Sequence, residues 1–150
     1  MTPPVKVTGP AWGGCFEIID MHLRTGRYLL PDDRYEGAVL FLETSEELPP
    51  ASYVYRTLMC MGERKLPQRF AAIVWARPKA WSLDTPNDPA AKAAYTRDQQ
   101  DAVLAAVAEY HPGVPLVTGA DFGHTEPQHV IPSGGTVTVD GEARQIEVTY

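Results

Sequence analysis

The stretch Gly37-Ala38-Val39-Leu40-Phe41-Leu42-Glu43 decides the fold class of this chain. A short, continuous apolar run that ends in polar residues indicates a β-strand buried on both faces. Residues 70–75 form a second run of this kind, and residues 115–117 begin a further strand. The segments between these strands have helical patterns. Strands that alternate with helices predict an α/β domain whose sheet is partly parallel.

Apolar residues at helical spacing predict three helices between the strands. The first helix stops at Gly26, the second opens at Pro49-Pro50, and the third spans about 88–110. Their expected apolar faces are, in chain order, Phe16, Ile19 and Leu23; Val54, Leu58 and Met61; and Val103, Leu104 and Val107.

The two ends of the chain predict additional strands. Residues 5–8 alternate as a short strand that Gly9-Pro10 closes, and residues 136–148 form a β-hairpin around Asp140-Gly141. No repeat or interdomain linker interrupts the sequence. We therefore expect residues 1–150 to form a single α/β domain, with a mixed sheet, packed helices and a C-terminal β-hairpin.

Composition excludes several classes of partner. The net charge is −6 and the basic residues are scattered, which argues against binding to a nucleic acid polymer or an anionic membrane. No apolar run approaches the length of a membrane span. The two cysteines, Cys15 and Cys60, make no disulfide framework, and the start Met1-Thr2-Pro3-Pro4 lacks a signal pattern. These features predict a cytoplasmic protein.

Ionisable residues follow two of the predicted strands. The run 37–42 ends in Glu43, and the strand that begins at residue 115 continues into Asp121 and His124. Ligand crevices in open α/β sheets lie outside the carboxyl ends of the strands. If the two strands are parallel neighbours, Glu43 and His124 meet at one rim as two members of a catalytic triad. The alternative is a solvated carboxylate at a strand end and a histidine that caps nearby backbone.

A nucleophile to complete such a triad is not evident. The serines stand at positions 45, 52, 82 and 133, and none lies in a Gly-x-Ser-x-Gly elbow. Cys15 follows two glycines, but a small buried thiol is its more ordinary role.

A metal site at His124, Glu126 and His129 is the competing hypothesis. Its spacing matches no standard zinc pattern, and Pro127 prevents a helical arrangement of ligands. We expect neither a metal nor another cofactor. Trp81, in a proline-rich loop, is a candidate for packing or for stacking on a ligand.

A series of motifs resembles the LD-carboxypeptidase family of serine peptidases, from about Gly9 onward. The motifs share their order and spacing with that family, and the segments DFGHTEPQ and GGTVTVDG are closer to its branch of microcin C immunity peptidases. They are Gly13-Gly14, GAVLFLE at 37–43, FAAIVWAR at 70–77, Asp121-Phe122-Gly123-His124 and Pro132-Ser133-Gly134-Gly135.

This resemblance implies the C-terminal, swivelling β/β/α-type domain of such a peptidase. It implies that Glu43 and His124 are catalytic, and that the serine and the oxyanion hole lie in an N-terminal domain that this chain lacks. Family members hydrolyse an L,D-peptide bond in murein fragments or the acyl link of a peptidyl-nucleotide. Cys15 departs from the family pattern, since many relatives have Asn after the two glycines.

Further expectations follow from the lack of that N-terminal domain. The chain alone should be inactive without a serine nucleophile, and an apolar surface left exposed should favour a homodimer. A non-catalytic binding module of the same fold remains the alternative function, and a metal-dependent hydrolase is a second one.

Overall fold

A six-stranded mixed sheet forms the framework of the molecule. The computed structural model describes residues 5–150, and the strands lie in the order β4-β3-β2-β1-β5-β6. The strands are β1 (Lys6–Cys15), β2 (Val39–Glu43), β3 (Ala72–Ala76), β4 (Leu116–Ala120), β5 (Thr136–Asp140) and β6 (Gln145–Thr149). The helices are α1 (Phe16–Thr25), α2 (Ala51–Glu63) and α3 (Pro89–Tyr110), with 3₁₀ turns η1 (Asp32–Tyr35) and η2 (Pro67–Arg69).

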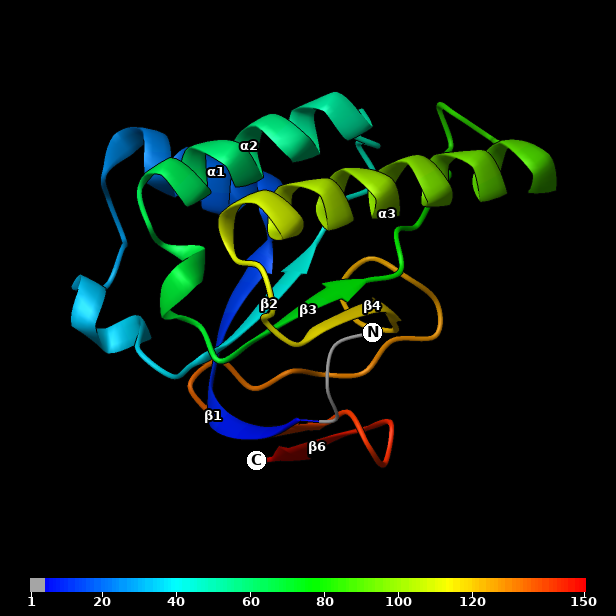
Figure 1. Ribbon diagram of the computed structural model, residues 1–150. Helices are drawn as coiled ribbons and strands as arrows, with labels where there is room; N and C mark the ends of the chain where they lie inside the picture. The colour runs from blue at the N-terminus through cyan, green and yellow to red at the C-terminus, as the bar shows by residue number, and fades with distance from the viewer. Residues whose placement is uncertain (1–4) are drawn as a thin grey trace.

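The sheet has a parallel part and an antiparallel part. Strands β1 to β4 pair in parallel, whereas β5 pairs antiparallel with both β1 and β6. Figure 1 shows the three α-helices on one side of the parallel strands, and the segment between β4 and β5 on the other side, where the sheet curls round to β6. The predicted fold class is confirmed: an α/β domain with a mixed sheet, packed helices and a C-terminal hairpin.

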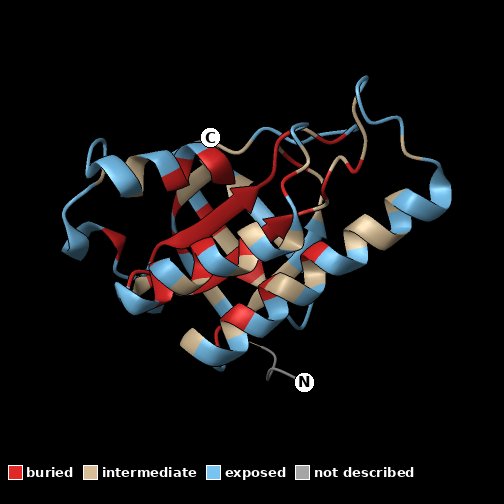
Figure 2. Ribbon diagram, turned by 90° about the horizontal axis from the view of Figure 1, so that it is seen from above, coloured by how far each residue is buried: buried red, intermediate tan, exposed pale blue. Residues whose placement is uncertain are grey.

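Strand β2 is central because apolar layers cover both of its faces. All five of its residues are buried, as the red strands in Figure 2 illustrate. Leu40 and Leu42 pack into the cluster under the helices, and Val39 and Phe41 pack into a second cluster on the other face. This two-sided burial explains why the strand reads as a continuous apolar run.

Strand β1 is longer than predicted. It spans Lys6–Cys15 instead of ending near residue 8, and it continues through Gly9, Pro10 and two further glycines. A Cβ at Gly9 would lie 2.1 Å from the Gly37 carbonyl oxygen, and one at Gly13 would lie 1.8 Å from the Phe41 carbonyl oxygen. These glycines therefore let β1 approach β2 closely instead of ending the strand.

The predicted helical faces are largely confirmed. Phe16 and Ile19 on α1, and all three expected residues on α2, lie in the core under the helices. Leu104 is the exception, because it is 51% exposed. The face of α3 that packs inward consists of Gln99, Val103 and Ala106. These residues are four and three positions apart and share one side of the helix, whereas Leu104 points away from it.

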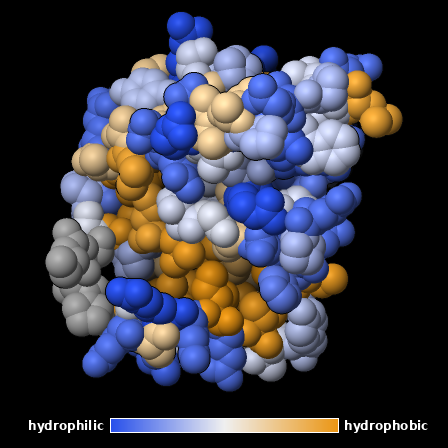
Figure 3. All heavy atoms as spheres, turned by 90° about the vertical axis from the view of Figure 1, so that its right-hand side faces the viewer, coloured by the Kyte–Doolittle hydropathy of each residue, from blue (hydrophilic) through white to orange (hydrophobic). Residues whose placement is uncertain are grey.

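Some apolar surface remains beside the sheet. Figure 3 shows one face of the molecule, on which hydrophobic side chains gather at the level of the sheet, below the more polar surface of the helical layer. The partly buried members of the second cluster are Val7, Val117, Ala120, Ile131, Ile146 and Val148. None of the helices described in residues 5–150 is long and apolar enough to cross a bilayer. Residues 1–4, from which we inferred that the chain lacks a signal pattern, lie outside the described residues.

Candidate functional site

Glu43 and His124 lie in contact at the carboxyl end of the parallel strands. The His124 Nδ1 atom is 2.7 Å from Oε2 of Glu43. Glu43 is the last residue of β2 and its side chain is 7% exposed, whereas the His124 side chain is 37% exposed. A buried carboxylate thus holds one ring nitrogen while the imidazole edge faces solvent.

The two residues meet by a route that differs from the sequence hypothesis. Strands β2 and β4 are parallel but not neighbours, because β3 lies between them. The segment after β4 turns beneath the sheet, where Phe122 packs edge-on against Phe41 with ring centroids 5.4 Å apart. This packing of Phe122 carries the next residues across β3 to the end of β2.

Gly123 permits the final approach. Its φ is +78°, and a Cβ there would lie 2.3 Å from Cγ of Glu43. A side chain at this position would therefore be strained in the backbone and would displace the carboxylate.

A second carboxylate contacts the other ring nitrogen. The Nε2 atom of His124 is 3.1 Å from Oε2 of Glu46, a residue in the loop after β2 whose side chain is 56% exposed. Only the contact at Nδ1 has the geometry of a hydrogen bond, and the contact at Nε2 is the close approach of a negative charge. Two negative charges thus flank the ring and favour its protonated form.

The pKa of His124 reflects these contacts. Partial burial lowers it, but the hydrogen bond to Glu43 and the negative charges of Glu43 and Glu46 outweigh that effect, so the pKa is raised above its usual value of 6.5.

Glu17, on the first turn of α1, fixes the loop that carries Glu46. Its Oε1 atom accepts hydrogen bonds from the Ser45 backbone N–H at 3.0 Å and from the Ser45 hydroxyl at 2.7 Å. The thiol of Cys15 donates to its other oxygen at 3.6 Å, and burial raises the pKa of that thiol. Sequence reasoning overlooked Glu17 and Glu46, since one acidic residue in a helix and one in a loop carry no distinctive pattern.

The remaining sequence candidates do not join the pair as a nucleophile or as metal ligands. Ser45 is buried and its hydroxyl donates to Glu17, and the thiol of Cys15, the other candidate nucleophile, also donates to Glu17. Within residues 5–150 no three His, Cys, Asp or Glu side chains are placed to share a metal ion, so His124, Glu126 and His129 form no such cluster.

A basic hollow opens beside His124. Its volume is about 240 Å³, and it is lined by Arg77 after β3, by Lys79 and Trp81 in the following loop, by Lys92 on α3 and by residues 124–126. Sequence reasoning identified Trp81 as a stacking candidate but did not predict the basic residues around it, because they come from separate elements.

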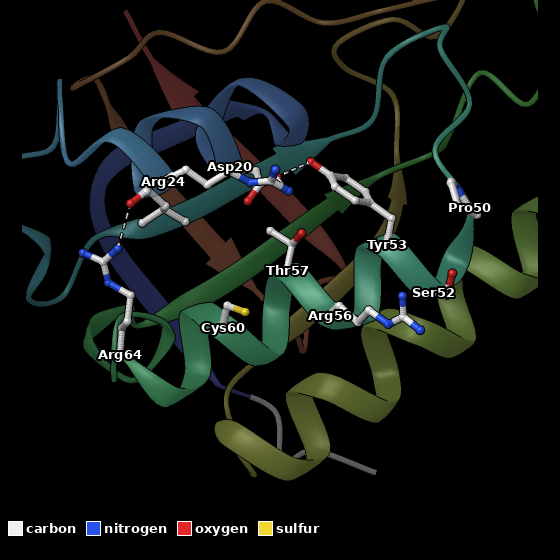
Figure 4. Close-up of a pocket in the computed structure, with 10 residues that line it drawn as sticks. Asp20, Arg24, Pro50, Ser52, Tyr53, Arg56, Thr57, Cys60 and Arg64 are labelled. Atoms are coloured by element: carbon white, nitrogen blue, oxygen red, sulfur yellow. Dashed lines mark hydrogen bonds and ion pairs between the residues drawn. The ribbon is translucent and has the colours of Figure 1, made fainter.

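A larger hollow lies elsewhere, between α1 and α2. Its volume is about 450 Å³, and Figure 4 shows Asp20, Arg24, Tyr53 and Arg64 among its lining residues. The Tyr53 hydroxyl donates to Asp20 at 2.7 Å, and burial with this bond raises the pKa of Tyr53. Arg24 pairs with Asp20, and Arg64 donates to the Leu23 carbonyl. These groups satisfy one another, and neither Glu43 nor His124 reaches this hollow.

Comparisons with known proteins agree with the fold. The family described as LD-carboxypeptidase C-terminal domain matches residues 8–139. An MccF-like protein from Streptococcus pneumoniae, solved with AMP, is 22% identical with a TM-score of 0.76, covering 97% of this chain and 41% of that chain. The microcin C7 self-immunity protein MccF is 19% identical with a TM-score of 0.71, covering 99% of this chain and 40% of that chain.

A third similar structure is a muramoyltetrapeptide carboxypeptidase from Oxalobacter formigenes. It is 24% identical with a TM-score of 0.70, and the match covers 97% of this chain and 46% of that chain. A search of curated proteins found no match. The chain thus spans less than half the length of the structures that it resembles. The match over residues 8–139, together with the shared fold, shows that this chain belongs to the LD-carboxypeptidase C-terminal domain family.

Proposed function

We propose that this chain supplies the Glu and His of a Ser-Glu-His triad in a serine peptidase, with Glu43 and His124 in these roles. The single observation that supports this most strongly is the 2.7 Å contact between His124 Nδ1 and the buried Oε2 of Glu43. A carboxylate at this nitrogen fixes the imidazole tautomer and stabilises its cationic form. The other nitrogen then remains for the reacting groups.

In the proposed reaction, Nε2 of His124 takes the proton of a serine hydroxyl while the serine oxygen attacks the substrate carbonyl. His124 then gives this proton to the leaving amine. In the second half, His124 takes a proton from a water molecule that attacks the acyl-serine ester, and returns it to the serine oxygen as the acid is released. The serine and the oxyanion-binding N–H groups belong, in this proposal, to an N-terminal domain outside residues 1–150. The chain alone is accordingly expected to be inactive.

Glu46 must leave Nε2 before this reaction can proceed. In this proposal the serine hydroxyl approaches Nε2, which the Oε2 atom of Glu46 contacts in this structure, and the charge of Glu46 favours the protonated imidazole that cannot act as a base. Because this side chain is largely exposed, docking of a serine-bearing domain can displace it without breaking buried contacts.

The proposed substrate has an amide bond next to a D-amino acid or a nucleotide. The similar structures include a muramoyltetrapeptide carboxypeptidase and MccF in complex with aspartyl sulfamoyl adenosine. We therefore propose hydrolysis of an L,D-peptide bond in murein fragments or of the acyl link in a peptidyl-nucleotide, in the cytoplasm.

The test begins with the coding sequence upstream of the Met1 codon, to define the natural gene product that carries these residues. That product is assayed on a murein tetrapeptide and on an aminoacyl sulfamoyl or phosphoramidate nucleotide. Glu43→Gln and His124→Ala should each lower kcat/KM by several orders of magnitude, because general base and orienting group act as a unit.

Matched controls are Glu47→Gln and His129→Ala, which alter exposed residues close in sequence to the pair. Both should retain turnover near that of the wild type. If Glu43→Gln and His124→Ala also retain it, the triad assignment is wrong. A gene product that is folded, lacks a serine-bearing domain and hydrolyses neither substrate would favour the alternative of a binding module.

A further inference from the structure

The basic hollow beside His124 has the chemistry of an anion site. Arg77, Lys79 and Lys92 supply three cationic side chains around a volume of about 240 Å³. They come from the end of β3, from the loop after it and from the first turns of α3. Only the fold brings these three residues together.

The neighbouring carboxylates compensate these charges incompletely. Arg77 donates through Nε to Asp121 at 2.8 Å, and Lys79 lies 3.9 Å from the Glu126 carboxylate, whose side chain is 81% exposed. Lys92 has no ion-pair partner within the described part of the chain, residues 5–150. The three basic side chains therefore exceed the two carboxylates beside them by one positive charge.

Trp81 holds two of the cations near one another. The Nζ atoms of Lys79 and Lys92 each lie 5.1 Å from the centroid of its indole ring. Cation–π contact stabilises each ammonium over the ring, but two like charges at one ring repel each other. An anion between them would relieve this repulsion and accept hydrogen bonds from both.

A buried hydroxyl provides an independent observation. Thr125, which also lines the hollow, is 2% exposed, and its Oγ1 atom has no hydrogen-bond partner among residues 5–150. A buried polar atom without a partner is costly, and such atoms are rare in folded proteins. The atom itself is closed to solvent, so a ligand oxygen in the hollow would become its partner once the hydroxyl turns toward the hollow.

We propose that this hollow binds the anionic group of the substrate's leaving part, through paired carboxylate or phosphate oxygens. This inference rests on the proposed function. In the first half of that reaction, the ester bond to serine forms and the amide C–N bond breaks. The serine proton passes through His124 to the leaving nitrogen.

The chemistry of the leaving group explains the position of the hollow. When the leaving group is a C-terminal amino acid, only the Cα atom separates its nitrogen from its carboxylate. The nitrogen receives its proton from His124, so the carboxylate must lie beside His124, where the hollow opens. The lysines and Arg77 then select substrates that have a free anionic end.

The test measures binding rather than turnover, so that it does not depend on the triad. The 150-residue chain is titrated with N-acetyl-D-alanine, with its neutral amide and with adenosine monophosphate. The signal is the indole N–H resonance of Trp81, assigned with Trp81→Phe. We expect saturable shifts with the two anions and none with the amide, and at least tenfold weaker binding in the Lys79→Met/Lys92→Met double variant.

Lys65→Met is the matched control, since it removes an exposed lysine beyond the end of α2 and should bind as the wild type does. Tighter binding of the carboxylate would identify a peptide end, and tighter binding of the phosphate would identify a nucleotide. Both results support an anion site. Equal binding by the double variant, saturation by the neutral amide, or no saturation by either anion would overturn it, whatever the fate of the triad.

Discussion

His124 lies between two carboxylates that differ in burial. Glu43 is buried at the end of β2 and cannot move without disturbing the core, whereas Glu46 is more than half exposed. The contact with Glu43 is therefore fixed by the packing of the core, whereas the contact with Glu46 can break without disturbing that packing. Both carboxylates favour the imidazolium form, so a change at either of them should alter the pKa of His124.

The titration of His124 should reveal both contacts. Because its pKa is raised on folding, the stabilisation that it contributes is fully present below the ordinary value of 6.5 and is lost as the pH rises through the raised value. Glu46→Gln should lower the titration midpoint by removing one negative charge, and Glu43→Gln should also lower it. The midpoint is read from the imidazole C–H resonances. A midpoint that is unchanged in Glu46→Gln would show that the Glu46 contact does not exist in solution.

Gly123 offers a direct test of the approach between the segment after β4 and Glu43. Gly123→Ala should destabilise the protein by the cost of a left-handed alanine, about 1–2 kcal/mol, and by a further amount for displacing the Glu43 carboxylate. Gly134→Ala is the matched control, because Gly134 has φ +77° and a Cβ there would meet no atom within 4 Å. Urea unfolding measures both variants. Equal losses would mean that Gly123 serves the backbone alone.

Two neighbouring elements hold the loop between β2 and α2 in place. On one side Glu17 of α1 binds the backbone and hydroxyl of Ser45. On the other side the Pro49 carbonyl accepts hydrogen bonds from Tyr95 at 2.9 Å and from Gln99 at 2.7 Å, both on α3. The loop that carries Glu46 is therefore fixed at both ends, while the Glu46 side chain stays free to turn.

Removal of the Glu17 clamp should loosen this loop. Glu17→Ala leaves the buried Ser45 N–H and hydroxyl without their acceptor, and this should lower the free energy of unfolding by about 1–3 kcal/mol. Glu142→Ala, at an exposed turn position, should change it little. Urea unfolding gives the stability, and hydrogen exchange at the Ser45 amide reports the loop itself. Exchange as slow in Glu17→Ala as in the wild type would contradict the clamp.

At the scale of the whole molecule, the sheet ends in two unpaired edges within residues 5–150. Strands β4 and β6 are the outermost strands, and apolar side chains on both remain partly exposed. An open edge next to an apolar surface is a template for further association. A serine-bearing domain or a second copy of the chain could cover this surface.

The predicted homodimer can be tested on the chain alone. We expect the weight-average mass in sedimentation velocity to rise with concentration, because apolar surface beside the sheet is then buried between copies. Val130→Asp alters a side chain that is 71% exposed next to Ile131, and it should weaken this association. Leu83→Asp, at an exposed position in the loop after β3, is the control. A chain that stays monomeric at every concentration would contradict the prediction.

Much of the architecture was predictable because it depends on local patterns. The apolar run of β2, the spacing of Val54, Leu58 and Met61 on α2, and the Asp140-Gly141 turn each follow from the sequence within a few residues. Glu43 and His124 were also identified, since each follows a predicted strand. These features are encoded by neighbours along the chain, and this is why periodicity and turn chemistry reveal them.

The sequence by itself determined which helices and strands form, because hydrophobic spacing and turn preference act over a few positions. It did not determine where β1 ends, since that strand continues through Gly9 and Pro10 to Cys15. The tertiary structure decided the pairings between elements. These include the close approach of β1 to β2 at Gly9 and Gly13, and the crossing of His124 beneath β3 to reach Glu43. They also include the gathering of Lys79 and Lys92 at Trp81. Such contacts join residues far apart in sequence, and only the packing of the whole sheet and its helices selects them.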